Sequence, residues 1–458
     1  MKSPLTEPLP VIEPVVWRHS IIALLVAIVF VATSAEMAYA VVNFSAMPVF
    51  IPTIGLSDAE ANRWIGIIGV AFLLTEGVLK GPLGALGDRI GRKPLILAGP
   101  ILSTITSLLT PLIHNPYALV SLRVLDGIGA AALWPAVFSL IGDRVPEERR
   151  AMAMSMFNVA YILGIAFGPS LGGNINHWAQ TALHMSEAHS KIASFYAAAF
   201  LFGFTALTAM LFIPATRRSA VPTSENKNLE DKTASSAAVS SESAPTLADL
   251  KQMLKRIPMT LLMTFIIFLG VGFIMLYVKR FAGEPLGPFH MSEQEFGNTL
   301  VIPALLIGLL SVPMGTLGDR IGKALAVRIG IGLCAAAYWL MLAFPNRPTL
   351  ILFGTLIGVG FVLAFPAWMA LVTEQSVGNQ RGAVVGAVAT AQGVGAIAGS
   401  AFSAFLYPLG AMALGPLSLP AHSLPFLLCG IMLTCAFLMA LFTVRSPRPG
   451  QTESASLE

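Results

Sequence analysis

The chain has 458 residues, of which 55% are hydrophobic and only 11% are charged, and its mean hydropathy is +0.75. This composition excludes an ordinary water-soluble globular protein and indicates a chain that crosses a membrane several times. The Lys and Arg residues number 28 and the Asp and Glu residues 24, so the net charge of +4 gives no indication of a nucleic-acid partner.

Twelve apolar segments are long enough to cross a bilayer whose hydrocarbon core is about 30 Å thick. Six precede a polar stretch and six follow it, which predicts an all-α membrane protein built from two six-helix bundles. The predicted bundles cover residues 18–213 and 257–445, with a linker at 214–256 and polar tails at 1–17 and 446–458. The segment centres lie near residues 30, 73, 103, 129, 163, 203, 268, 306, 334, 361, 394 and 434.

Most Lys and Arg residues lie on the same side of the predicted membrane as the amino terminus. Because positively charged loops stay in the cytoplasm, we expect both termini there and the protein in the cell (inner) membrane. The amino-terminal tail lacks a small-residue cleavage site, so we expect a cytosolic tail rather than a signal peptide. Cys334, Cys429 and Cys435 all lie in apolar segments, and no disulfide framework is expected.

The first span carries an acidic residue, Glu36, past its middle. Thr33, Glu36, Tyr39 and Asn43 recur at helical spacing, which predicts a polar stripe that faces protein rather than lipid. Ionisable groups at this depth are costly and are functional candidates. Two interpretations stay open: Glu36 is a carrier that takes up and releases a proton, or it is a permanently ionised partner of Arg123.

A string after the second span recurs in the second half of the chain. Residues 84–93 read G-A-L-G-D-R-I-G-R-K, and G-T-L-G-D-R-I-G-K starts at Gly315, so the offset from Gly84 is 231 (315 − 84). The offset persists without a gap for more than eighty residues, and Gly164, for example, falls on Gly395. The chain therefore consists of two copies of one membrane unit.

The repeated loop motif combines glycines with charges of both signs. The glycines let the chain turn tightly. Asp88 is placed to face the amino-terminal end of a helix in the other half, where negative charge is favoured. Arg92 can pair with Asp143 at the end of the fourth span. The candidate residues of this motif and its partners in the two copies are Gly84, Asp88, Arg89, Gly91, Arg92, Asp143, Asp319, Arg320, Lys323 and Glu374.

The fourth span contains L-V-S-L-R-V-L-D-G-I-G-A-A at residues 119–131. Arg123 cannot lose its proton in a protein, so it needs a counter-ion or an aqueous cavity. Asp126 lies three residues further on and shares its helical face. In one interpretation Arg123 is shared between Asp126 and Glu36, so that protonation of Glu36 changes the charge of the cavity. In the other, Arg123 and Asp126 are a fixed pair that braces the helix.

The fifth span reads G-I-A-F-G-P-S-L-G-G at residues 164–173. Glycines four residues apart form one smooth helix face, which allows a partner helix to approach closely. Pro169 removes a backbone donor and should bend the helix. The candidate residues of this motif are Gly164, Gly168, Pro169, Gly172 and Gly173.

Two polar segments follow. The outer loop at 174–192 contains His177, His184 and His189, for which metal sensing is conceivable, although their irregular spacing is a weak signal. The linker holds a Ser/Ala-rich stretch near 219–245 that lacks the apolar content to pack. Residues 246–256 then combine a helical apolar spacing with basic residues, which predicts a helix on the inner membrane surface.

The three motifs resemble those of the major facilitator superfamily. Residues 84–93 are similar to its loop motif, 119–131 to its fourth-helix motif with a membrane arginine, and 164–173 to the antiporter motif of its drug:H⁺ antiporter families. The resemblance covers residues 18–445 and implies two six-helix bundles around a central cavity, with alternating access. It also implies that the charged pairs of the loop motif hold the inner gate in the outward-facing state. A static topogenic loop would explain the basic residues but not the repeated acids.

The two halves differ in their charges within the membrane. The second half has no acidic residue at comparable depth, so the chemistry is expected in the first half. Glu76 and Lys80, four residues apart, are expected to neutralise each other. The offset pairs the charged residues Glu36, Glu76, Arg123 and Asp126 with Ile267, Ile307, Gly354 and Ile357.

We therefore predict a secondary active transporter, most simply a proton-coupled antiporter that exports lipophilic or cationic small molecules. It is not expected to be an enzyme, to use a cofactor or to hold a metal, and a monomer suffices. Trp134, Trp368 and Phe365 should help to line an adaptable apolar pocket. The alternatives are a same-fold exporter of one metabolite, such as a sugar, amino acid or siderophore, and a membrane sensor or assembly partner that moves nothing.

Overall fold

The computed structural model describes residues 15–214, 258–283, 288–374, 381–409, 412–414 and 417–444. Eleven helices in this part are long and apolar enough to cross a membrane, and Met259–Met275 is a shorter apolar helix. Each of the twelve predicted centres falls inside one of these helices, so the prediction of a helical membrane protein is confirmed. The predicted surface helix at 246–256 lies outside the described residues.

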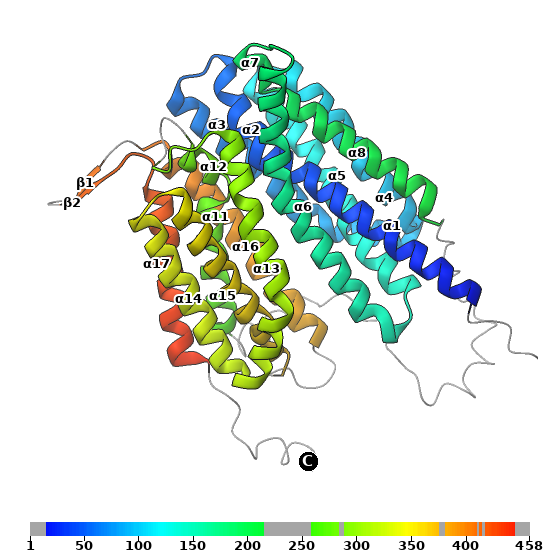
Figure 1. The fold of residues 1–458 in the computed structure, drawn as a ribbon. Helices are drawn as coiled ribbons and strands as arrows, with labels where there is room; N and C mark the ends of the chain where they lie inside the picture. Colours follow the sequence, from blue (N-terminus) through cyan, green and yellow to red (C-terminus); the bar gives the residue numbers. More distant parts are fainter. Residues whose placement is uncertain are drawn as a thin grey trace, which may run out of the picture.

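The helices run in chain order through both bundles (Figure 1). The first bundle holds α1 (Val15–Ala40), the π-helix η1 (Val41–Ala46), α2 (Met47–Phe50), the short 3-10 helix η2 (Ile51–Ile54), α3 (Asp58–Ile90), α4 (Arg92–Leu109), η3 (Thr110–Leu112), α5 (Pro116–Arg144), α6 (Glu147–Thr181), α7 (Glu187–Ser190) and α8 (Ala193–Phe212). The second holds α11 (Pro258–Met275), α12 (Val278–Ala282), α13 (Glu293–Ile321), α14 (Lys323–Ala343), α15 (Arg347–Glu374), α16 (Arg381–Leu406) and α17 (Leu424–Thr443).

One small element departs from the all-α prediction. Strands β1 (Met412–Leu414) and β2 (Leu417–Leu419) pair in antiparallel register, with Met412 opposite Leu419. They lie in the connection between α16 and α17 and project away from the helices (Figure 1). The hairpin leaves the helical bundles unchanged, because it is added in a loop.

The internal repeat is visible in the packing of the helices. A Cβ atom on Gly99 of α4 would lie 2.6 Å from the carbonyl oxygen of Gly129 on α5. A Cβ on Gly330 of α14 would lie 2.5 Å from the carbonyl oxygen of Gly360 on α15. Both pairs are related by the offset of 231 residues, so each bundle uses small residues to bring two backbones together at the same place.

The two bundles meet through α6 with α13 and through α3 with α16. They lie close together at the end where α7 and α12 are found, which we call the α7 face, and they spread apart toward the opposite end (Figure 1). Helix α1 begins and α17 ends at this opposite end, which we call the terminal face. The structure therefore shows one conformation of a two-bundle molecule, in which the α7 face is closed.

Local sequence signals set the ends of the helices that cross between the faces. Ser57 with Glu60 and Ser292 with Glu295 form capping boxes at the amino-terminal ends of α3 and α13. At the other ends, Gly91 has φ +94° and Gly322 has φ +89°, a region that glycine enters without steric cost.

The end of α1 is irregular. Residues Val41–Ala46 form the π-helix η1, closed by the N–H of Met47 on the carbonyl of Val42. Pro48 follows directly and has no N–H to continue an α-helical ladder, which favours the wider turn. Such π-helical turns are frequent at functional sites, and this one carries Asn43.

Large apolar side chains are exposed on the outside of both bundles. Phe200, Leu309 and Phe442 are each about three-quarters accessible, at 73%, 74% and 75%. Apolar surface of this extent marks contact with lipid or with another protein, and the length of the helices favours lipid. The chain is therefore a multi-pass membrane protein.

Candidate functional site

A buried charged pair lies at the centre of the first bundle. Arg123 and Asp126 of α5 are 2% and 1% exposed, and Nη1 of Arg123 donates to Oδ2 of Asp126. The second donor, Nη2 of Arg123, binds Oδ1 of Asn43 in η1. The guanidinium also lies 4.5 Å from the ring centroid of Phe72, a cation–π distance. The pair predicted from the spacing of Arg123 and Asp126 is present.

The second partner of Arg123 differs from the prediction. We expected Glu36 to share Arg123 with Asp126, but Asn43 takes this position. The π-helical turn explains the difference, because it rotates the residues after Ala40 relative to a regular helix and turns Asn43 toward α5. The interpretation of Glu36 as a permanently ionised partner of Arg123 is therefore not supported by the geometry.

Tyr39 lies between the charged pair and the aromatic core of the bundle. Its hydroxyl is 2.9 Å from Oγ of Ser103 on α4, and its ring packs against Phe202 at 4.7 Å between centroids. Trp134 lies 6.3 Å from the same ring. The polar stripe predicted for α1 is therefore divided, since Tyr39 and Asn43 reach into the bundle core whereas Glu36 lies against α6.

Glu36 is 7% exposed and lies where α1 crosses α6. The groups that act on its carboxylate are the Tyr161 hydroxyl and the charges of Glu76 and Lys80. Lys80 is committed to Glu76, since Nζ lies 2.8 Å from Oε1 in the self-neutralising pair predicted from the sequence. A buried carboxylate without a cation of its own is costly to ionise, which suits a group that exchanges protons.

The glycine face of α6 positions Glu36. A Cβ on Gly164 would lie 2.7 Å from Cβ of Glu36, and one on Gly168 would lie 2.4 Å from Cβ of Ala40. A Cβ on Gly172 would meet Oγ of Ser45 in η1. These glycines are thus the surface on which α1 rests, and α1 is the partner helix that the spacing predicted.

The other residues of the same motif face the second bundle. A Cβ on Gly173 would lie 2.6 Å from the carbonyl oxygen of Glu293, and a Cβ on Gly297 would lie 2.4 Å from the carbonyl oxygen of Pro169. Helix α6 therefore contacts α1 with one side and α13 of the other half with the next. This arrangement connects the Glu36 region to the interface between the bundles.

The structure corrects one pairing of the internal repeat. Gly395 is the counterpart of Gly164, and a Cβ there would contact Cβ of Phe268, 3.2 Å away. Glu36 therefore corresponds to Phe268, not to Ile267, because the offset is 232 residues in the first helix of each half and 231 from the second helix on. The counterpart is still uncharged, and the asymmetry between the halves stands.

The loop motif lies at the terminal face. Nε of Arg92 is 3.2 Å from Oδ2 of Asp143, and Arg92 also forms an ion pair with Asp88. Asp88 does not contact the other half as we expected, since its side chain is 64% exposed and the ion pair in the described residues is within its own half. The reason is the conformation, because the bundles are apart at this face (Figure 1). Arg89 is exposed, and Gly84 lies in ordinary contact with Pro135.

The second copy of the loop motif is described only in part. Arg320 is exposed and Lys323 is half-buried at the start of α14. The side chains of Asp319 and Glu374 lie outside the described part of the structure, so the predicted pair of Lys323 with Glu374 stays a prediction.

The remaining sequence candidates are dispersed. His177, His184 and His189 are exposed, and among the described residues no group of His, Cys, Asp and Glu could hold a metal. Trp134 is buried in the first bundle, whereas Trp368 donates from Nε1 to Oγ1 of Thr264 in the second, over 3.3 Å. The two tryptophans therefore belong to different bundles.

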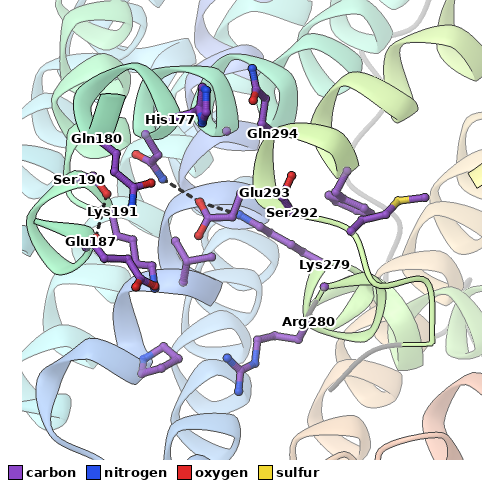
Figure 2. A pocket seen from close by; sticks show the side chains of 17 residues that line it. His177, Gln180, Glu187, Ser190, Lys191, Lys279, Arg280, Ser292, Glu293 and Gln294 are labelled. Atoms are coloured by element: carbon purple, nitrogen blue, oxygen red, sulfur yellow. Dashed lines mark hydrogen bonds and ion pairs between the residues drawn. The ribbon is translucent and has the colours of Figure 1, made fainter. Parts of the chain in front are cut away.

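A polar pocket that the sequence did not reveal lies between the bundles at the α7 face (Figure 2). Its volume is about 380 Å³, and both halves contribute to its wall. The capping-box serines mark the starts of α3 and α13, and the acids that follow them could have indicated charged helix ends there. The charged side chains that line the pocket are Glu187, Lys191, Lys279, Arg280 and Glu293.

The chain was compared with known proteins. The profile of the Major Facilitator Superfamily matches it in two segments, residues 24–287 and 260–458. An uncharacterised MFS-type transporter of Methanocaldococcus jannaschii is 23% identical over 362 residues, which cover 79% of this chain and 85% of that protein. These matches extend over both bundles.

Shorter matches point to resistance proteins. The methyl viologen resistance protein SmvA of Salmonella typhimurium is 36% identical over 134 residues, or 29% of this chain and 27% of that protein. The quinolone resistance protein NorA of Staphylococcus aureus is 28% identical over 127 residues, or 28% of this chain and 32% of that protein. The alignments therefore span about a third or less of these two relatives.

Among solved structures, the nucleoside transporter NupG superimposes with a TM-score of 0.69 at 11% identity, over 92% of this chain and 100% of that chain. At this identity the likeness shows the fold alone. The fold is nevertheless matched from end to end.

Proposed function

We propose that this chain, which belongs to the major facilitator superfamily, exports lipophilic or cationic small molecules in exchange for protons. The observation that carries the proposal is the environment of Glu36. Its carboxylate is buried at the contact of α1 with α6 and has no cation of its own, because Lys80 is paired with Glu76 and Arg123 with Asp126. A proton and a cationic cargo could compete for such a group.

The charge of the cluster favours this class of cargo over an anion. Arg123 would be the natural partner of an anionic substrate, but it is 2% exposed and bound by Asp126 and Asn43. An incoming anion would have to replace both partners. The printed names of the relatives SmvA and NorA, which refer to methyl viologen and quinolone resistance, support the same direction.

The proposed cycle is alternating access between two positions of the bundles. If both termini are cytoplasmic, the structure is the inward-facing state, with the α7 face closed. In the opposite state the terminal face closes, and Asp88 would then reach the second bundle as the loop motif implies. Protonation and deprotonation of Glu36 would occur from opposite sides of the cell membrane, and one chain contains both bundles that the cycle needs.

The test is ethidium accumulation in efflux-deficient cells that express the protein, with and without a protonophore. We expect the protein to lower accumulation, and we expect both the protonophore and Glu36→Gln to restore it. Glu187→Gln is the matched control, because it removes a carboxylate that lies at the exposed α7 face and pairs with Lys191. It should retain export.

The outcomes separate the candidate functions. Full gradient-driven export by Glu36→Gln would refute Glu36 as the proton carrier. No effect of a well-expressed wild-type protein on accumulation would instead favour an exporter of one metabolite. Binding of a solute without any transport would favour a sensor.

A further inference from the structure

We propose that the short helix α12 is a latch that holds the two bundles together at the α7 face and has to be released before this face can open. Lys279 and Arg280, adjacent residues of this helix, are the parts that bind the first bundle. The inference rests on the alternating-access cycle proposed above, but it does not depend on which solute is moved.

Lys279 bridges the two bundles. It is 5% exposed, and its Nζ donates to the carbonyl oxygen of Ser45 in η1 over 3.1 Å. The same Nζ lies 3.5 Å from Oε2 of Glu293 at the start of α13. Burial lowers the pKa of Lys279, and the neighbouring Glu293 opposes this shift. The ammonium is thus held between one partner in its own half and one in the other.

Glu293 is shared in the same way. Its Oε2 accepts a hydrogen bond from Nδ2 of Asn176 on α6, at 3.0 Å. Asn176 is itself fixed, because its Oδ1 accepts from the N–H of Ser194 at 3.0 Å. Figure 2 shows Lys279 and Glu293 pointing toward each other, with the dashed bond to Glu293 from the first bundle. Separation of the bundles would break both contacts.

Arg280 makes a second set of contacts with α3. Its Nε donates to Oδ1 of Asn62 over 3.2 Å, and its Nη2 lies 3.9 Å from Oδ1 of Asp58. Tyr277, just before α12, donates from its hydroxyl to the carbonyl oxygen of Asn62 over 2.6 Å. Three closely spaced side chains of the second bundle therefore bind the first.

The internal repeat indicates that this arrangement is specific to one half. Asp58 and Glu293 follow the capping serines of α3 and α13 and are equivalent acids. Each lies beside one cation of α12. The corresponding short helix of the first half, α2, reads M-P-V-F and has no charge. Both acids thus depend on cations from the second half.

The chemistry of these contacts suits an interface that has to open. A buried ion pair gains little net stability over apolar packing, because removing two charges from water costs about as much as their attraction returns. The pocket beside the latch is open to solvent, and Glu293 keeps 25% of its side chain exposed. Water can therefore replace the lost partners as the bundles separate.

The test measures the distance between the bundles at the α7 face. Spin labels are placed on Gln180→Cys of α6 and His290→Cys before α13, in a full-length chain whose three native cysteines are replaced by alanine. Both positions are exposed. Distance distributions are recorded in lipid nanodiscs without substrate or a proton gradient.

We expect Lys279→Met to raise the ratio of open to closed molecules about tenfold or more, since a charge-assisted hydrogen bond is lost. Lys191→Met is the matched control: it removes one positive charge from the same pocket, but its ion pair with Glu187, at 2.8 Å, lies within one bundle. It should leave the distribution unchanged. Glu293→Gln keeps the shape of the side chain and should shift the distribution in the same direction by a smaller factor.

Two results would overturn the latch: equal distributions in all the variants, or an equal shift in Lys191→Met and Lys279→Met. Because the distances are measured without cargo, a shift in a protein that does not export ethidium would retain the latch and reject the drug-export proposal. Ethidium export with an unchanged distance distribution in Lys279→Met and Glu293→Gln would do the reverse.

Discussion

Replacement of Gly168 by alanine tests whether the glycine face of α6 positions α1. The added Cβ would lie 2.4 Å from Cβ of Ala40, 2.9 Å from the carbonyl oxygen of Met37 and 3.0 Å from the N–H nitrogen of Val41. Two of these atoms are backbone, so no side-chain rotation can relieve the contact. The two helices have to move apart.

The size of the effect follows from these distances. Carbon atoms in favourable contact are at least about 3.5 Å apart, so the helices must separate locally by roughly 1 Å. Overpacking of this kind costs about 1–3 kcal/mol. For a unit of about 200 residues, each kcal/mol lowers the melting temperature by about 2–4 °C. Movement of α1 also displaces Glu36, one helical turn away, so transport should fall together with stability.

Thermal unfolding in detergent, followed by tryptophan fluorescence, measures the first effect and ethidium export the second. Gly203→Ala is the control, because a Cβ on Gly203 of α8 meets nothing within 4 Å. It makes the same chemical change in a membrane helix. If Gly168→Ala melted and exported like Gly203→Ala, the positioning role of the glycine face would be refuted.

Two further changes probe the charged groups. Arg123→Leu leaves the buried Asp126 without its cation and should cost about 3–5 kcal/mol, whereas Arg123→Leu with Asp126→Leu should recover most of it in the same melting assay; no recovery would argue against a mutually neutralising pair. Asp88→Asn removes a largely exposed partner of Arg92 and should cost less than about 1 kcal/mol while slowing export without weakening ligand binding; an equal loss of binding would contradict a gate role.

The fold was predictable because its signals are local or repeated. Twelve apolar runs gave the helices, and the offset of 231 residues gave the two bundles. The Arg123–Asp126 pair followed from a spacing of three residues on one helix. These features need no knowledge of how distant segments are placed.

The parts that could not be predicted depend on irregular backbone or on contacts between distant segments. Asn43 reaches Arg123 because of the π-helical turn, which periodicity arguments based on a regular α-helix do not include. The contact of Lys279 with Ser45 joins positions 234 residues apart through a main-chain carbonyl, so no side-chain pattern reports it. The exposure of Asp88 depends on which face is closed, and a sequence describes every conformation at once.

The correspondence of Glu36 with Phe268 has a consequence for the evolution of the duplicated unit. In each copy a glycine of the fifth helix packs on the same backbone atoms of the first helix, although one copy presents a carboxylate and the other a phenyl ring. The two side chains share neither charge nor size, yet the frame around them is the same. Descendants of one ancestral repeat can therefore acquire or lose an ionisable group at this position without rebuilding the helix crossing, and changes of coupling mechanism are accessible by single substitutions.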